Sequence, residues 1–198
     1  MLKNKFQTLC QNYTSNQTLI NALWQEIKKK HSEPTRYYHT LKHLEQFYTE
    51  LQEFDTVIEF SIFYHDIIYD VSYKDNEEQS ASLCQKIMEE LNIPFQTIKE
   101  VVQLINETKM HKATLKRNAL FLDTDLAILG SSREIYEKYT NNVRKEYAIY
   151  SDAIYTKCRK SVLEHFLEED KIYQSHYFYE KYEKKARDNL GNEIMGLK

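Results

Sequence analysis

The chain has 198 residues, a length typical of one ordinary domain. Only 3 Gly and 2 Pro leave little material for tight turns, which excludes most sandwiches and barrels of short strands. Hydrophobic residues make up 41%, and 27 Lys and Arg against 30 Asp and Glu give a net charge of -3, so we expect a soluble globular protein without nucleic acid as a partner.

Hydrophobic residues recur at helical spacing along nearly the whole chain, and no internal repeat or Gly/Ser-rich linker suggests a boundary. The sequence therefore predicts an all-α helical bundle that forms a single domain over residues 1–198. The helices expected in chain order cover about residues 4–30, 35–54, 56–69, 76–91, 94–109, 119–129, 135–147, 157–168 and 176–190.

Four local signals refine these boundaries. Asn16 is a potential break in the first segment. Pro94 is expected in the first turn of its helix, and Gly130 is expected to end the segment before it. Residues 131–134, Ser-Ser-Arg-Glu, have the spacing of a capping box that would start the next helix.

The segment 56–69 is apolar on nearly every side, which predicts a helix buried in the middle of the bundle. It contains the adjacent pair His65 and Asp66. An ionised Asp66 in such surroundings is costly unless a cation or a set of donors compensates it, and no Lys or Arg occurs between Asp55 and Tyr73. We therefore expect a partner from elsewhere in the fold, either a His or Arg in a buried ion pair or a metal ion.

His39 and His43 are four residues apart, which predicts that they share one face of the helix expected to begin near Thr35. On a helical wheel this face lies away from the apolar stripe of the same segment. The two imidazoles are therefore not simply core residues. The alternative is a solvated polar face with two incidental histidines.

Asp123 and Asp125 lie in the otherwise apolar segment 121–129. Helix N-capping by Asp123, with Asp125 in the first turn, is one explanation for both. However, three separate segments now place His or Asp against apolar surroundings. That pattern is how several helices together build a mononuclear site for a divalent cation.

The three cysteines, Cys10, Cys84 and Cys158, form a sparse, odd-numbered set without CxxC spacing. The first residues lack the apolar region of a signal peptide, so we expect a reducing cytoplasm. No uncharged apolar run approaches the ~20 residues of a membrane helix, and we expect no membrane partner.

The order His39, His65-Asp66, Asp125 resembles the H…HD…D signature of the HD-domain metal-dependent phosphohydrolases. The likeness extends to blocks typical of a bacterial subgroup of predicted HD-superfamily hydrolases. These blocks cover residues 36–43, 63–70, 75–81 and 122–130, with shorter stretches at 144–147 and 186–190. The resemblance thus spans most of the chain and implies the HD-domain type of helical bundle.

By this resemblance the metal ligands are four residues, with three further candidates for binding metal or phosphate. The ligands implied are His39, His65, Asp66 and Asp125, and the additional candidates are His43, His111 and Asp123. Asp123 competes with Asp125 for the last position. His111 stands alone where dinuclear relatives have a His pair, which makes a second metal doubtful. The mixed N/O set suits Mn²⁺, Mg²⁺, Fe²⁺, Co²⁺ or Ni²⁺ without choosing among them.

The activity implied is hydrolysis of a phosphoester in a small metabolite, with a nucleotide as one candidate, by a metal-activated water. Arg36 and Lys109, with His43 and His111, are candidates to stabilise the phosphoryl charge. Asp70, expected one turn after Asp66, and Glu77 are candidates to orient a histidine or relay a proton.

Two alternatives remain at this point. One is a di-iron HD oxygenase, and the other is a non-catalytic, metal-stabilised protein that binds a ligand or a partner. Association of several copies of the chain is compatible with either.

Overall fold

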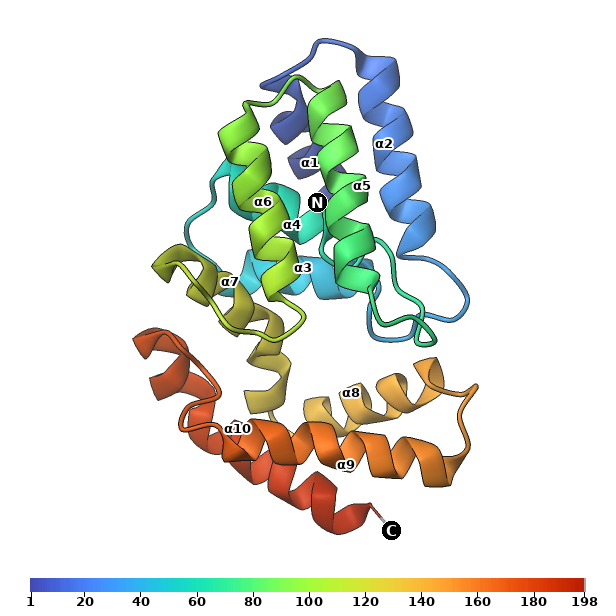
Figure 1. Ribbon diagram of the computed structural model, residues 1–198, viewed down its shortest axis with the longest axis vertical. Helices are drawn as coiled ribbons and strands as arrows, with labels where there is room; N and C mark the ends of the chain where they lie inside the picture. The colour runs from blue at the N-terminus through green and yellow to red at the C-terminus, as the bar shows by residue number, and fades with distance from the viewer. Residues whose placement is uncertain (198) are drawn as a thin grey trace. The chain divides into compact units, whose positions relative to one another are not determined.

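The structure is a computed structural model that describes residues 1–197. Within this range the chain forms ten α-helices and one 3-10 helix and no β-strand, which confirms the predicted all-α class (Figure 1). The chain divides after Lys112 into two compact units, and each is described by itself. The HD-domain type and the single domain stay predictions.

The first unit contains six helices. They are α1 (Leu2–Gln11), α2 (Gln17–Lys30), α3 (Leu41–Glu50), α4 (Thr56–Tyr64), α5 (Asn76–Glu90) and α6 (Phe95–Glu107). Helix α4 contacts α1, α3, α5 and α6, and its residues from Phe60 to Tyr64 are all buried. The prediction of a central buried helix in this segment is therefore confirmed, although the helix is shorter than expected.

Side-chain caps explain where several of these helices begin. Asn16 Oδ1 accepts a hydrogen bond from Leu19 N at 3.0 Å, and α2 starts there, so the potential break is real. Thr40 Oγ1 accepts from Lys42 N at 3.4 Å and starts α3. The predicted helix 35–54 is therefore wrong at both ends, because residues 35–40 form turns and α3 ends at Glu50.

Helix α4 ends at Tyr64 and does not reach residue 69. The chain after it is held by Ser80 of α5, whose Oγ accepts from Ile68 N at 3.1 Å and lies 3.3 Å from Ile68 O. These bonds take the place of helical hydrogen bonds at Ile68. As a result, His65 caps the helix and Asp66 lies just beyond it.

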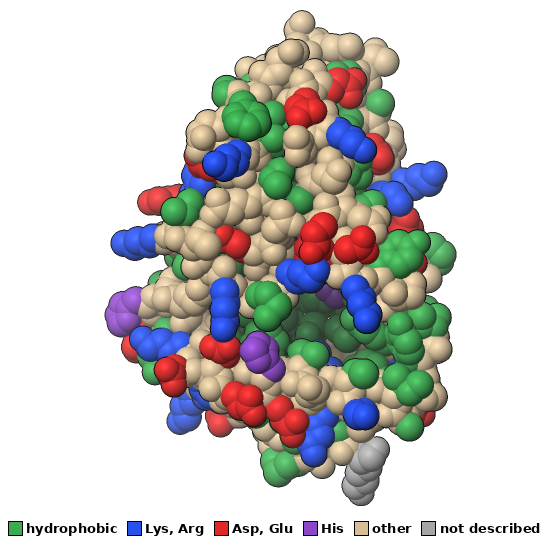
Figure 2. Space-filling view, in the orientation of Figure 1, with side chains coloured by type: hydrophobic (Ala, Val, Ile, Leu, Met, Phe, Trp, Pro, Cys, Tyr) green, Lys and Arg blue, Asp and Glu red, His purple; other side chains and the backbone are tan. Residues whose placement is uncertain are grey.

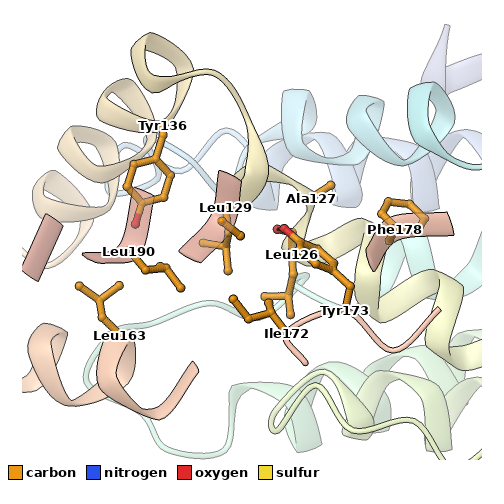
Figure 3. Packing of buried hydrophobic residues seen from close by; sticks show 10 residues of the cluster. Leu126, Ala127, Leu129, Tyr136, Leu163, Ile172, Tyr173, Phe178 and Leu190 are labelled. Atoms are coloured by element: carbon orange, nitrogen blue, oxygen red, sulfur yellow. Dashed lines mark hydrogen bonds between the residues drawn. The ribbon is translucent and has the colours of Figure 1, made fainter. Parts of the chain in front are cut away.

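The second unit contains α7 (Lys116–Asp125), the 3-10 helix η1 (Leu126–Gly130), α8 (Arg133–Glu146), α9 (Asp152–Glu168) and α10 (His176–Gly196). Its core gathers buried side chains from η1, α8, α9 and α10, among them Leu129, Leu163, Phe178 and Leu190, and Leu120 of α7 packs against them (Figure 3). Tyr173 lies fully buried in this cluster and donates its hydroxyl to Leu126 O at 3.0 Å.

Gly130 ends η1 for a packing reason. A Cβ at this position would lie 2.5 Å from Tyr182 Cβ, so only glycine lets α10 pass this close. Its φ is not positive, so the need for glycine here comes from this close approach. The predicted capping box is also wrong, since Ser132 is the N-cap of α8 and makes no side-chain cap bond. Pro94 is likewise the N-cap of α6, not a first-turn residue.

No helix within residues 1–197 is long and apolar enough to cross a membrane. Figure 2 shows Lys and Arg side chains interspersed with Asp and Glu on one face of the molecule. This face therefore carries no extended field of a single sign.

Candidate metal centre

Three potential ligand atoms converge in the first unit. His43 Nε2 and His65 Nε2 lie 3.1 Å apart, and Asp66 Oδ2 lies 3.1 Å from His65 Nε2 and 3.6 Å from His43 Nε2. Both imidazoles are buried, and the Asp66 side chain is 20% exposed. This group could hold a metal ion. We call it the His43–His65–Asp66 triad.

His65 owes its orientation to its place at the end of α4. Its Nδ1 lies 3.1 Å from Ser61 O and 3.2 Å from Ile62 O, so Nδ1–H donates to the helix carbonyls. A neutral imidazole protonated at Nδ1 carries its lone pair on Nε2. The end of the helix therefore fixes the tautomer that presents Nε2 to a metal.

The imidazoles around Asp66 lower its pKa when they carry a proton. Burial raises the pKa of Asp66, but protonated His65, which bonds to it, together with protonated His39 and His43, outweighs burial and holds the pKa below its ordinary value. The sequence predicted that a partner from elsewhere must meet this carboxylate. His43 of α3 is such a partner, and the adjacent His65 is a second one.

His43, which the sequence gave as an additional candidate ligand, is a member of the triad. Because α3 starts at Leu41, His39 precedes the helix, and the predicted shared helical face is wrong. His43 is buried in the first turn, whereas the ring of His39 stacks on Tyr69 with centroids 4.1 Å apart. The rings of His39 and His43 are 5.7 Å apart. The role of His39 as a metal ligand stays a prediction.

Arg36 is buried beside the triad and bonds to the backbone. Its Nη1 donates to Asp66 O at 2.6 Å and to His39 O at 3.2 Å, and Nη2 donates to Ile67 O at 3.0 Å. Its Nε donates to Glu33 at 3.4 Å. The guanidinium is thus engaged by the protein itself, and its predicted contact with a phosphoryl group stays a prediction.

The other residues predicted from the first unit lie outside the triad. Asp70 is exposed and accepts from Ser72 N at 2.8 Å, in a loop and not one helical turn after Asp66. Lys109 pairs with Glu78 at 2.5 Å and donates to a backbone carbonyl at 2.8 Å.

Glu77 and His111 are partly buried, and neither joins the triad. Glu77 lies in the first turn of α5. His111 has a positive φ of 49° after α6, a conformation that is uncommon for a residue other than glycine. The predicted roles of both residues stay predictions.

Asp123 and Asp125 belong to the last turn of α7 in the second unit. Asp123 does not cap its own helix, as the alternative interpretation required. Its carboxylate instead accepts from Gln174 N at 2.9 Å and Ser175 N at 2.7 Å, just before α10. Burial raises the pKa of Asp123 against the lowering effect of these bonds. The predicted ligand roles of both aspartates stay predictions.

Sequence reasoning missed His31, which is 1% exposed at the end of α2. Its Nδ1 lies 3.1 Å from Ile27 O, and within the described residues its buried Nε2 has no hydrogen-bond partner. Burial and then the Arg36 charge lower the pKa of His31 to about 3. Its position four residues after Ile27, at the end of an amphipathic helix, was the available signal.

The triad fits a divalent ion. Two ligands about 2.1 Å from one ion lie about 3.0 Å apart at a right angle and about 3.4 Å apart in a tetrahedron. The three separations observed, 3.1, 3.1 and 3.6 Å, fall near these values. Two imidazoles and one carboxylate leave further positions for water or substrate and suit Mn²⁺, Fe²⁺, Co²⁺, Ni²⁺ or Zn²⁺.

No protein-family model, no curated protein and no solved structure matches this chain. The resemblance to HD-domain hydrolases therefore stays a prediction from the motifs. The geometry of the triad is the observation on which a function can be argued.

Proposed function

We propose that the protein is a metal-dependent hydrolase of phosphoesters in small metabolites. The observation that carries the proposal is the convergence of His43 Nε2, His65 Nε2 and Asp66 Oδ2 beside an otherwise apolar helix. A bound divalent ion supplies Lewis-acid chemistry that activates water and polarises a phosphoryl oxygen. The H…HD…D motif order adds the expectation that the substrate is a phosphoester.

The residues of the triad have separate tasks in this proposal. His65 is held in one tautomer by the carbonyls of α4, so it offers Nε2 without reorganisation. Asp66 brings the negative charge that a cation requires. His43 completes the set from α3, a different helix, so the ligands come together only in the folded chain.

A second candidate function is a metal-stabilised protein without catalysis. The observation that favours it is that Arg36 and Lys109, the two side chains predicted to bind a phosphoryl group, already bond to groups of the protein. Arg36 bonds to backbone carbonyls, and Lys109 pairs with Glu78. The di-iron alternative is less favoured, because residues 1–197 hold one group of this kind, with three ligand atoms.

The test begins with metal binding and then measures turnover. Purified wild-type protein is freed of metal, titrated with Mn²⁺ by calorimetry, and assayed against nucleotides and sugar phosphates. Asp66→Asn keeps the shape of the side chain but removes its charge, and it is expected to abolish both Mn²⁺ binding and turnover. Asp75→Asn, an exposed carboxylate outside the triad, is the matched control and is expected to behave as wild type.

Thermal unfolding separates the two functions. Mn²⁺ at 100 times its Kd is expected to stabilise the wild type by about 2.7 kcal/mol and to leave Asp66→Asn unchanged. Stabilisation without turnover of any phosphoester would favour the structural role. Turnover that survives both metal removal and Asp66→Asn would contradict the hydrolase mechanism.

A further inference from the structure

We propose that Arg36 is a positioning residue of the metal centre, whose guanidinium ties the chain before His43 to the chain after His65. The inference rests on the proposed metal-dependent function and assigns Arg36 a task other than the phosphoryl contact expected from the sequence. It follows from where its hydrogen bonds go.

The bonds of Arg36 join two segments that are far apart in the sequence. Nη1 donates both to His39 O, in the turn before α3, and to Asp66 O, just after α4. Nη2 donates to the next carbonyl, Ile67 O, at 3.0 Å. One nitrogen therefore bridges the segment that leads into His43 and the backbone of a triad residue. A change in these bonds changes the separation of the ligands directly.

Burial makes this arrangement specific to arginine. The Arg36 side chain is 0% exposed, and a buried charge is tolerated only when its donors are satisfied. Glu33, which accepts from Nε at 3.4 Å, forms an ion pair with Arg36 and is itself 31% exposed. The flat fork of a guanidinium can serve several carbonyls at once, whereas a lysine ammonium cannot reproduce that geometry.

Tyr69 and His39 add ring contacts to the hydrogen bonds of Arg36. The guanidinium carbon of Arg36 lies 5.4 Å from the centre of the Tyr69 ring, and Tyr69 in turn stacks on His39. Arg36 is thus held by carbonyls on one part of the loop and by an aromatic ring on another. This packing fixes the loop segments on either side of the triad.

The direction in which the metal Kd changes on replacing Arg36 shows whether Arg36 acts by positioning the ligands or by its charge. A positive guanidinium beside a cation site repels the cation, so removing its charge alone would tighten metal binding. Loss of the bonds between the two segments would loosen the ligand set and weaken metal binding. The two explanations therefore predict opposite changes in Kd for a neutral replacement of similar length.

The experiment compares Mn²⁺ binding by the wild type with binding by Arg36→Met and Arg36→Lys. Substitutions of residues that orient metal ligands cost about 10–100-fold in affinity, and we expect a rise in Kd of this size for both variants. Because Lys keeps the charge and loses the fork, it should not rescue binding. The visible spectrum of the Co²⁺-loaded protein should change in both variants, since it reports ligand geometry.

Arg187 provides a matched control for stability. Its Nη1 donates to Leu167 O at 3.0 Å and its Nη2 to Glu169 O at 2.7 Å, so it also ties a turn together, but in the second unit. Arg187→Met is expected to lower the melting temperature and to leave the Mn²⁺ Kd unchanged. Glu33→Ala frees only the Nε end of Arg36 and, should the Arg36 variants fail to fold, is expected to give a smaller rise in Kd.

The outcomes separate this inference from the proposed function. An unchanged or lower Kd in the folded Arg36 variants, full rescue by Lys, or an equal rise in Kd in Arg187→Met would overturn the positioning role. If no Arg36 variant folds, an unchanged Kd in Glu33→Ala would overturn it as well. Metal binding without phosphoester turnover would overturn only the hydrolase function. A wild type that binds no divalent ion would overturn both.

Discussion

Acid should destabilise the first unit through His31, the buried imidazole at the end of α2. Its pKa is about 3 in the folded protein, against an ordinary value of 6.5. As pH falls below 6.5 the unfolded chain takes up a proton that the folded chain refuses until about pH 3. The unfolded state therefore gains from falling pH, and stability is lost as the solution becomes more acidic.

The size of the effect follows from the two pKa values. Each unit of difference is about 1.4 kcal/mol, and the loss builds up only below the unfolded pKa. Between pH 7.5 and 4.5 the contribution of His31 amounts to about 2.7 kcal/mol, and it is still incomplete at the lower limit. This is a large part of the stability of an ordinary domain, which is about 5–15 kcal/mol.

Trp24 offers a local probe for this measurement. It is the single Trp of the chain, and it lies buried in α2, the helix that His31 caps. Urea unfolding followed by Trp24 fluorescence at pH 7.5, 6.5, 5.5 and 4.5, with metal removed by EDTA, gives the pH slope of the first unit. His31→Leu should flatten this slope, whereas the exposed His176→Gln should not. Equal slopes in the wild type and His31→Leu would refute the reasoning.

Two further predictions concern the second unit. Gly130→Ala forces a Cβ against Tyr182 and should destabilise the protein by about 1–3 kcal/mol, whereas Gly191→Ala, in α10 with nothing within 4 Å, should stabilise it by about 0.5–1 kcal/mol. Chemical unfolding followed by circular dichroism measures both, and changes of the same sign would contradict the packing argument. Asp123→Ala leaves the Ser175 N–H without its acceptor and should cost about 1–3 kcal/mol by the same measurement, so an unchanged stability would show that this bond is unimportant.

Helix positions could be predicted where local periodicity and the fold agree. The ranges 76–91 and 94–109 match α5 and α6 within two residues, because their apolar spacing also decides which face they bury. The range 56–69 fails at its end, where side chains from elsewhere hold the backbone. Arg36 bonds to the carbonyls of Asp66 and Ile67, and Ser80 bonds to Ile68. No local pattern contains such contacts.

The sequence predicted which kinds of side chain meet in the candidate site, but not where the helix that carries His43 begins. The cost of burying Asp66 among apolar residues correctly required a partner from another segment, and His43 supplies it. His39 was assigned by its match to the H…HD…D signature, whereas its shared face with His43 depended on a helix expected to begin near Thr35. Because Thr40 caps α3 instead, His43 enters the first turn and lies at the triad. The start of α3 therefore separates the two histidines, since His43 lies in its first turn and His39 lies before it.

Three arginines donate hydrogen bonds to backbone carbonyls at turns, a position where other proteins often have a glycine. Helix ends leave carbonyls without helical partners, and a glycine in the αL conformation commonly satisfies them. The chain has only 3 Gly and none at positive φ, and arginine side chains bind carbonyls of its turns instead. Arg144 donates to the turn after α8, Arg187 to the turn after α9, and Arg36 to the segments on either side of the triad.

Two of these arginines lie in sequence blocks that resemble HD-domain hydrolases. The blocks are residues 144–147 and 186–190, and in both the guanidinium holds a turn. A likeness in these blocks therefore concerns how the backbone is held and says nothing about the reaction. Only His43, His65 and Asp66 offer converging ligand atoms within the described residues. The case for catalysis therefore rests on metal binding by those three side chains.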